Sequence, residues 1–174
     1  TRFYDKYYGK TGWKAITIRS LSIGQGEVLV TPLQLANQAA MIANKGYFIT
    51  PHLNKTDSMR LHRHQTHIDS SYFSVVQEGM HRVMTNGTGR WYQVPGVENA
   101  GKTGTAQNPH GKDHAIFIGF APLENPQIAV AVVVENAGFG STWAAPVASM
   151  MMEQYLNGSV TRTDLRKRYT NSEL

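Results

Sequence analysis

Three strand-like segments follow one another in the second half of the chain without a helical pattern between them, at residues 99–107, 114–121 and 128–135. The middle segment alternates, with Ile116, Ile118 and Phe120 on one face. The last segment is apolar on both faces, which favours a central place in a sheet. The connection at residues 122–126 is short enough for a hairpin. The pattern therefore predicts consecutive antiparallel strands rather than alternating β–α–β units.

Helical patterns flank these strands, two before and one after, at residues 31–45, 71–85 and 143–156. The first has the clearest boundaries, because Thr31 can cap its amides and Pro32 suits the first helical position. Gly46 can then end it in the left-handed region of backbone space. Helices before and after a run of strands indicate an α+β fold, in which helices pack on an antiparallel sheet.

The composition is that of an ordinary globular domain, with 174 residues of which 41% are hydrophobic and 17% charged. The sequence contains no cysteine, which excludes disulfides and thiol catalysis. The formal charge is +5, but the basic residues are scattered, so a nucleic-acid-binding stripe is not expected. The longest apolar run, Ile128–Val134, is too short to span a bilayer.

The stretch Ala100–Gln107 reads Ala-Gly-Lys-Thr-Gly-Thr-Ala-Gln and fits two different chemistries. Read from Gly96, it matches a phosphate loop that ends at Lys102 and Thr103. A phosphate loop must follow a buried strand and open a helix, yet the segment before it is not an apolar strand and Gly104 opposes a helix. The phosphate interpretation, which would make the chain a nucleotide hydrolase, is therefore disfavoured.

The second interpretation starts at Lys102, where Lys-Thr-Gly is typical of an edge strand beside an acyl-transfer site. An ammonium group there lowers the pKa of neighbouring groups and attracts a substrate carboxylate. Threonine hydroxyls can hydrogen-bond the same carboxylate, and Gly104 leaves room for the backbone of an extended substrate. The residues around the motif strengthen this interpretation.

Ordered blocks surround the motif, at Ser22–Gly26, Thr31–Ala36, Ala43–Gly46, Pro51, Glu78–Met80, His114, Phe117–Pro122 and Val134–Asn136. Together with Ala100–Gln107 they resemble the class B penicillin-binding proteins, the peptidoglycan D,D-transpeptidases. Their order and spacing agree with that family across about residues 3–157. The helix at Tyr72 and the loop at Glu135–Gly138 are most like the elongation-type branch, the penicillin-binding protein 2 group.

The resemblance implies the C-terminal half of a penicillin-binding-protein/serine β-lactamase-like transpeptidase domain over residues 1–157, with a polar tail at 158–174. In this family the acyl-enzyme forms on the serine of a Ser-x-x-Lys element, and a Ser-x-Asn element lines the opposite wall. No serine of this chain stands in either pattern. The chain alone is therefore expected to be inactive, whereas its parent protein is expected to cross-link stem peptides as a serine-type transpeptidase and to bind β-lactams.

The resemblance assigns roles to residues of the central motif. Lys102 and Thr105 are the expected catalytic residues: Lys102 acts electrostatically towards the serines, and the Thr105 backbone N–H is one oxyanion-hole donor. The expected substrate-binding residues are Thr103, Gly104, Thr105 and Gln107. They would hold a stem peptide that ends in D-Ala-D-Ala, or a β-lactam.

No cofactor and no metal are expected, although the pattern of His62, His64 and His67 invites a metal site. Without a helix or strand to fix ligand geometry, these histidines are interpreted as part of a solvated loop over residues 54–67. Peptidoglycan stem peptides and membrane proteins of cell-wall synthesis are the expected partners. The expected location is the periplasmic face of the bacterial inner membrane, with an anchor upstream of this chain.

An alternative is a catalytically dead penicillin-binding-like module that acts through protein contacts. The upstream sequence would distinguish the two possibilities, because Ser-x-x-Lys and Ser-x-Asn elements support the enzyme and their loss supports the binding module.

Overall fold

The computed structural model describes residues 2–53 and 62–171, in two compact units, Thr1–Val30 and Thr31–Leu174. Its elements are α1 (Arg2–Tyr8), α2 (Ala15–Ser22), α3 (Pro32–Ala43), β1 (Tyr47–Ile49), β2 (Arg63–Gln65), α4 (Ser70–Thr85), η2 (Arg90–Tyr92), β3 (Ala100–Ala106), β4 (His114–Ala121), β5 (Ile128–Val134), α5 (Ala144–Asn157) and α6 (Thr163–Thr170). Within the described ranges, no helix is long and apolar enough to cross a membrane. The division expected between residues 157 and 158 stays a prediction.

The N-terminal unit contains α1 and α2 and is held together by aromatic side chains. The buried Tyr4 ring lies 5.9 Å from the Tyr8 ring and 5.7 Å from the Trp13 ring, measured between centroids. The Tyr4 hydroxyl donates to the Glu27 carboxylate at 2.8 Å, which ties α1 to the end of this unit. Helix α2, which the sequence did not predict, ends at Ser22.

The second unit is built on a three-stranded antiparallel sheet in the order β3-β4-β5. The predicted α+β fold is confirmed, and each strand begins and ends within one residue of its predicted range. The prediction that residues 128–135 form the central strand is wrong, because β4 is central and β5 is at an edge of this sheet as described. β5 is apolar on both faces because α3 packs on one face and α5 on the other. Burial of both faces therefore does not require pairing of both edges.

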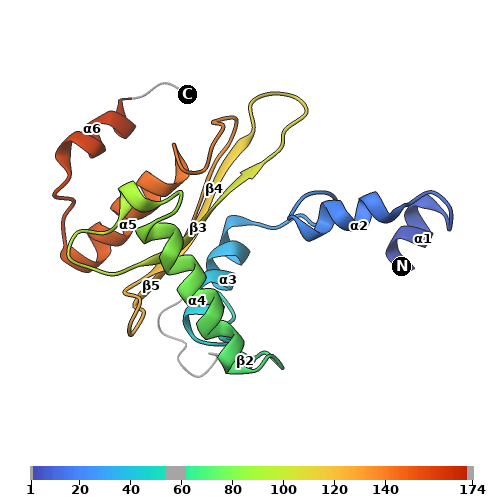
Figure 1. Ribbon diagram of the computed structural model, residues 1–174, viewed down its shortest axis with the longest axis horizontal. Helices are drawn as coiled ribbons and strands as arrows, with labels where there is room; N and C mark the ends of the chain where they lie inside the picture. The colour runs from blue at the N-terminus through green and yellow to red at the C-terminus, as the bar shows by residue number, and fades with distance from the viewer. Residues whose placement is uncertain (1, 54–61, 172–174) are drawn as a thin grey trace. The chain divides into compact units, whose positions relative to one another are not determined.

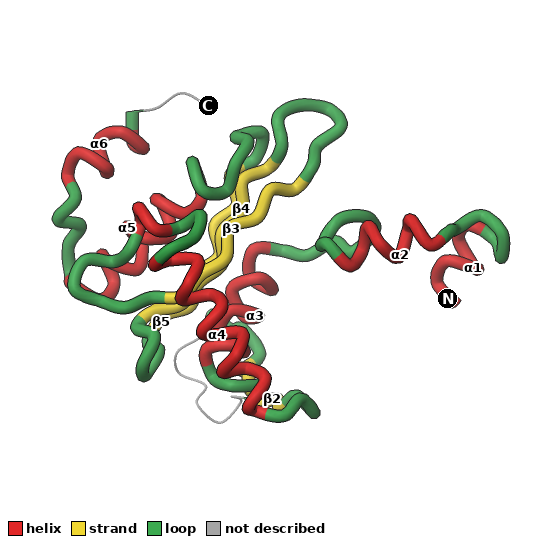
Figure 2. The backbone as a smooth tube through the Cα atoms, in the orientation of Figure 1, coloured by secondary structure: helices red, strands yellow, loops and turns green. Residues whose placement is uncertain are grey.

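Two hydrophobic cores lie on opposite faces of the sheet, which Figure 2 shows in yellow among the red helices of this unit. On one face, Phe117 of β4 packs in the same cluster as Met152 of α5. Helix α5 lies beside these strands in Figure 1. On the other face, Phe120 of β4 packs in the same cluster as Ile42 of α3 and Phe73 of α4. The alternation of a strand directs these two phenylalanines to opposite faces, so each face has its own helices.

Helix α3 begins as the sequence predicts and ends two residues earlier, at Ala43. The Thr31 hydroxyl accepts a hydrogen bond from the backbone N–H of Gln34 at 3.3 Å, which satisfies one of the amides of the first turn. Past the other end, Gly46 has a φ of +110°, the conformation that favours glycine. The Gln77 side chain of α4 donates to the carbonyl oxygen of Ile42 at 2.8 Å and so holds the last turn of α3 to α4.

Strands β1 and β2 form a second, two-stranded ladder that the sequence did not predict. Phe48 lies opposite His64 in this ladder, and their rings stack with 4.9 Å between centroids. His64 Nε2 also lies 2.9 Å from the Thr50 hydroxyl oxygen. The expectation of a solvated loop is thus corrected at residues 63–65, which form a strand; residues 54–61 of that loop lie outside the described residues.

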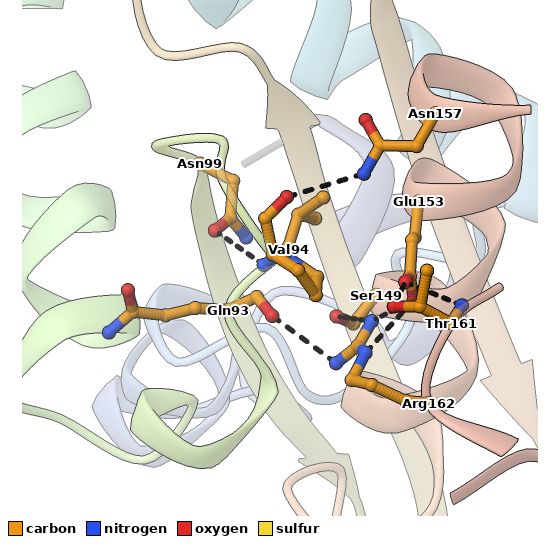
Figure 3. Close-up of polar contacts among 9 residues, drawn as sticks. Gln93, Val94, Asn99, Ser149, Glu153, Asn157, Thr161 and Arg162 are labelled. Atoms are coloured by element: carbon orange, nitrogen blue, oxygen red, sulfur yellow. Dashed lines mark hydrogen bonds and ion pairs between the residues drawn. The ribbon is translucent and has the colours of Figure 1, made fainter. Parts of the chain in front are cut away.

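The segment expected to be a polar tail contains helix α6. The residues directly before this helix are joined to the core by an ion pair (Figure 3). Glu153 of α5 is fully buried, and its Oε2 accepts from the Arg162 guanidinium at 2.9 Å. Its Oε1 accepts from the backbone N–H of Thr161 at 2.9 Å and from the hydroxyl of the same residue at 2.6 Å. Arg162 also donates to the Ser149 hydroxyl at 2.9 Å and to the Gln93 carbonyl oxygen at 3.2 Å. This network joins α5 to the segment before α6 and to the segment before β3.

The charge state of Glu153 follows from this network. Burial by itself raises the pKa of Glu153, but the hydrogen bonds from Thr161 and Arg162, together with the Arg162 charge, outweigh burial and lower that pKa. A carboxyl whose pKa is lower in the folded than in the unfolded state stabilises the fold above its unfolded-state pKa, about 4.3. That stabilisation is lost as the pH falls through the folded-state pKa.

We expect Glu153→Gln to lower the free energy of unfolding by about 3–5 kcal/mol at pH 7, because it leaves the Arg162 charge without its buried partner. Urea denaturation followed by circular dichroism measures this change. The exposed pair of Glu78 and Arg82, 2.7 Å apart on α4, provides the control, since Glu78→Gln is expected to cost less than about 0.5 kcal/mol. The difference between the two variants in the free energy of unfolding lost should become smaller as the pH falls below about 4, where Glu153 of the unaltered protein becomes protonated. Equal costs at neutral pH would contradict this account.

Candidate functional site

The central motif lies within β3, the outermost strand of the described sheet on the side away from β5. Its residues pair with β4 in the register Lys102–Ile118 to Thr105–Ala115. The edge-strand placement predicted for Lys-Thr-Gly is therefore confirmed. The phosphate-loop interpretation fails, because residues 100–106 form a strand where a phosphate loop requires the first turn of a helix.

The expected site residues divide between the two faces of β3. Residues opposite each other in an antiparallel pair share a face, so Thr103 and Thr105 lie on the Phe117 face, where α5 packs. Lys102 lies on the other face, and its exposed ammonium donates to the Thr103 carbonyl oxygen at 2.6 Å. Gln107 follows directly after the strand and is exposed. Because the two faces meet at the outer edge of the strand, a ligand lying along that edge can reach groups of both.

Thr103 has a partner that the sequence analysis did not single out. Its hydroxyl oxygen lies 2.7 Å from the hydroxyl oxygen of Thr88. Thr88 belongs to the turn Asn86–Gly89 after α4, to which the sequence assigned no role. His81 Nδ1 of α4 lies 3.1 Å from the Asn99 carbonyl oxygen and so ties that helix to the start of β3. A threonine between two glycines is too common a pattern to indicate this contact from sequence.

The segment that leads into β3 is fixed by polar side chains (Figure 3). Asn99 is buried, and its Oδ1 accepts from the backbone N–H of Val94 at 3.3 Å. Asn157 at the end of α5 donates to the Pro95 carbonyl oxygen at 3.3 Å, two residues after Gln93, whose carbonyl oxygen accepts from Arg162. The motif strand therefore enters the sheet from a segment that is anchored at several points.

Two loops meet beside the other end of β3. The Asn108 side chain donates to the Asn136 side-chain oxygen at 2.6 Å, and the Asn136 backbone N–H donates to His114 Nδ1 at 3.0 Å. These bonds tie the β3–β4 loop to the loop between β5 and α5. Gly140 of the second loop lies directly against the motif, since a Cβ there would collide with the Gly104 carbonyl oxygen.

The glycines around the motif differ in how much space the fold leaves for a side chain. A Cβ at Gly101 would collide with the ring of Phe117, and one at Gly140 would collide with backbone oxygen atoms. At Gly104 an added Cβ would lie 3.4 Å from the Ile116 Cβ, which is an ordinary van der Waals contact. The fold of the described residues therefore requires glycine at the first two positions and tolerates a side chain at Gly104.

Metal-ligating side chains do not gather in the part of the chain that the structure describes. No group of three or more His, Cys, Asp or Glu side chains there is arranged to hold a metal ion. The pattern of His62, His64 and His67 thus does not assemble a metal site among these residues, and His64 is engaged by Phe48 and Thr50.

Comparison with known sequences gives a consistent match. Residues 4–153 match a family model described as the penicillin binding protein transpeptidase domain. The peptidoglycan D,D-transpeptidase MrdA of Haemophilus influenzae is 34% identical to this chain over 184 residues, which cover 90% of this chain and 28% of that protein. The chain thus spans little more than a quarter of the length of this curated relative.

Solved structures give the same match. Penicillin-binding protein 2 of Pseudomonas aeruginosa, in complex with WCK 5153, is 38% identical with a TM-score of 0.78, over 93% of this chain and 38% of that one. The imipenem acyl-enzyme complex of Mycobacterium tuberculosis penicillin-binding protein A is 34% identical with a TM-score of 0.67, over 79% and 33%. The complex of Helicobacter pylori penicillin-binding protein 2 with MreC contains a chain 26% identical with a TM-score of 0.77, over 90% and 30%.

Because the fold leaves different amounts of space at these glycines, replacing each with alanine should affect stability differently. We expect Gly101→Ala to lower the free energy of unfolding by about 2 kcal/mol or more, because the methyl group displaces the buried Phe117 ring. Gly104→Ala should leave it unchanged or raise it by up to about 1 kcal/mol, because alanine restricts the unfolded chain. Urea denaturation of the two variants measures the difference. A Gly104→Ala cost as large as that of Gly101→Ala would show that the fold itself requires both glycines.

Proposed function

Because the chain belongs to the penicillin-binding protein transpeptidase family, as its ordered blocks predicted, we propose that it supplies the Lys-Thr-Gly-Thr wall of a serine-type peptidoglycan D,D-transpeptidase site. The edge position of β3 carries the proposal, because an extended peptide can pair along that edge while motif side chains meet its terminal carboxylate. Gly104 supports it further. The described fold tolerates a side chain at this position, so close approach of a ligand is a reason for glycine there.

The proposed ligand is a stem peptide that ends in D-Ala-D-Ala, or a β-lactam whose carboxylate takes the same place. An ionised carboxylate only accepts hydrogen bonds, so its site needs donors. The hydroxyls of Thr103 and Thr105 are such donors, and Lys102 adds a positive charge on the neighbouring residue. Gln107 continues the line of the strand and would contact the peptide farther from its carboxylate.

In the proposed reaction a serine oxygen bonds to the carbonyl carbon of the penultimate D-Ala, and the terminal D-Ala leaves as an amine that takes up the serine proton. An amino group of a second stem peptide then attacks the acyl-enzyme, which forms the cross-link and returns a proton to the serine. The Thr105 N–H would donate to the oxyanion, an interaction whose loss costs a rate factor of about one hundred or more. The serine belongs to a Ser-x-x-Lys element, a pattern that this sequence does not contain.

The same proposal gives the setting of the reaction. Relatives are peptidoglycan D,D-transpeptidases, and one solved relative is an imipenem acyl-enzyme, so we infer that β-lactams react with the protein in which this wall operates. The Helicobacter pylori relative was solved in complex with MreC, and we infer a protein partner of that kind. The inferred location is the periplasmic face of the bacterial inner membrane.

The chain alone should not be acylated, because the serine nucleophile of the proposed reaction is not in its sequence. Incubation with a fluorescent penicillin, followed by gel fluorescence and intact mass measurement, should detect no covalent adduct. The transpeptidase domain of Pseudomonas aeruginosa penicillin-binding protein 2 serves as the labelled control. A specific adduct on the chain would contradict the proposed division of the site.

A chimera tests the wall directly, with this chain in place of the corresponding residues of the Pseudomonas aeruginosa domain. We expect the chimera to be acylated and Lys102→Ala to slow acylation at least about a hundredfold, because the charge beside the nucleophile is lost. Lys112→Ala, in the exposed β3–β4 loop, is the matched control and should change the rate less than about twofold. A folded chimera that is not acylated would favour the binding-module alternative.

A further inference from the structure

The contact between Thr88 and Thr103 is not explained by burial. Their hydroxyl oxygens lie 2.7 Å apart, yet Thr88 is exposed and Thr103 is only half-buried. Water can satisfy exposed hydroxyls, so the fold gains little from pairing them with each other. The contact instead fixes the orientation of one particular hydroxyl, that of the motif threonine.

Thr88 is held in place by its backbone. The turn that carries it closes with a hydrogen bond from the Gly89 N–H to the Val83 carbonyl oxygen at 3.0 Å. A Cβ at Gly87 would lie 2.8 Å from the Val83 Cα, so the turn also lies tightly against the last part of α4. Met84, the next residue of that helix, is fully buried in the core beneath the sheet. The Thr88 hydroxyl is therefore presented to β3 from a well-anchored position.

The direction of the hydrogen bond between the two hydroxyls can be reversed, because each can donate or accept. A carboxylate that binds Thr103 accepts only, so the Thr103 hydroxyl must donate its proton to the ligand. Its oxygen then becomes the acceptor for the Thr88 proton. The result is a chain of donors, from Thr88 to Thr103 to carboxylate, in which each bond polarises and strengthens the next.

We propose that Thr88 is a positioning residue of the carboxylate site: it orients the Thr103 hydroxyl and donates to it when a carboxylate binds. The inference rests on the proposed function of Thr103. Thr88 is expected to act through Thr103 rather than on the ligand itself. Its effect should therefore appear only with ligands that carry a carboxylate.

The test compares two probes that differ at one group, acetyl-D-alanyl-D-alanine and its C-terminal amide. Chemical-shift titration of the isotopically labelled chain gives a dissociation constant for each, and the ratio of the two constants is the carboxylate preference. We expect Thr88→Val, which keeps the shape and removes the hydroxyl, to weaken carboxylate binding by about 3- to 10-fold and to leave amide binding unchanged. Thr88→Ser should restore the preference to within about twofold, because serine keeps the donor.

Thr85→Val is the matched control, since the Thr85 hydroxyl contacts the His81 carbonyl oxygen of its own helix at 3.3 Å. This variant should leave the preference unchanged. Thr88→Ala is a second variant without the hydroxyl, and backbone spectra of both Thr88 variants check that the fold is retained.

The outcomes separate the inference from the proposed function. If Thr103→Val removes the carboxylate preference while Thr88→Val and Thr88→Ala keep it, Thr88 is not a positioning residue and the proposed function stands. If the unaltered chain has no preference, or Thr103→Val keeps it, the proposed carboxylate site is wrong and the inference is overturned with it. Loss of binding to both probes in a folded Thr88 variant would show a general structural role and also overturn the inference.

Discussion

The packing of Phe117 against the glycines of the sheet is the constraint on which this unit depends. The ring is fully buried, and a Cβ at Gly101 would collide with it, while one at Gly119 would lie 2.7 Å from it. The ring therefore occupies space that side chains on β3 and β4 would otherwise fill. It also belongs to the core formed with α5, so one aromatic side chain fixes the strands to the helix that covers them. The motif is presented by a strand that has little freedom to shift.

This arrangement separates the groups that hold the strand from the groups that we propose to face a ligand. The buried contacts lie at the start of β3, where Asn99 fixes the entering segment and Gly101 receives the ring. The motif from Lys102 to Thr105 follows on the outer strand of the described sheet, where its residues are exposed or half-buried. Rigid support beside an exposed edge is what preorganised recognition of an extended peptide requires. The ion pair of Glu153 and Arg162 adds to that support, since Arg162 also bonds the Gln93 carbonyl oxygen and so holds the segment before β3 to α5.

Local patterns were sufficient where one segment alone determines the structure, as at the start of α3 and, to within one residue, the bounds of β3, β4 and β5. They failed where a partner distant in sequence decides. The apolar faces of β5 suggested a central strand, because a sequence records that faces are buried and not which edges are paired. Strand β2 is exposed and polar, so it exists through its pairing with β1 rather than through its own propensity. The segment that leads into α6 is held by Arg162, which pairs with the carboxylate of Glu153 buried in α5.

For the site, the sequence by itself determined the residue types and spacing of the motif and, through the order of the surrounding blocks, the family. Residue types and spacing are local properties, and a family is defined by them. Only the tertiary structure decided that the Thr88 hydroxyl lies within hydrogen-bond distance of the Thr103 hydroxyl, and that Gly140 packs closely against the Gly104 backbone. The tertiary structure also decided that Gly101 must be glycine to leave room for the buried Phe117 ring, whereas a side chain at Gly104 would make only an ordinary contact. These facts depend on which atoms lie within a few ångströms across the fold, and a linear order of residues does not contain those distances.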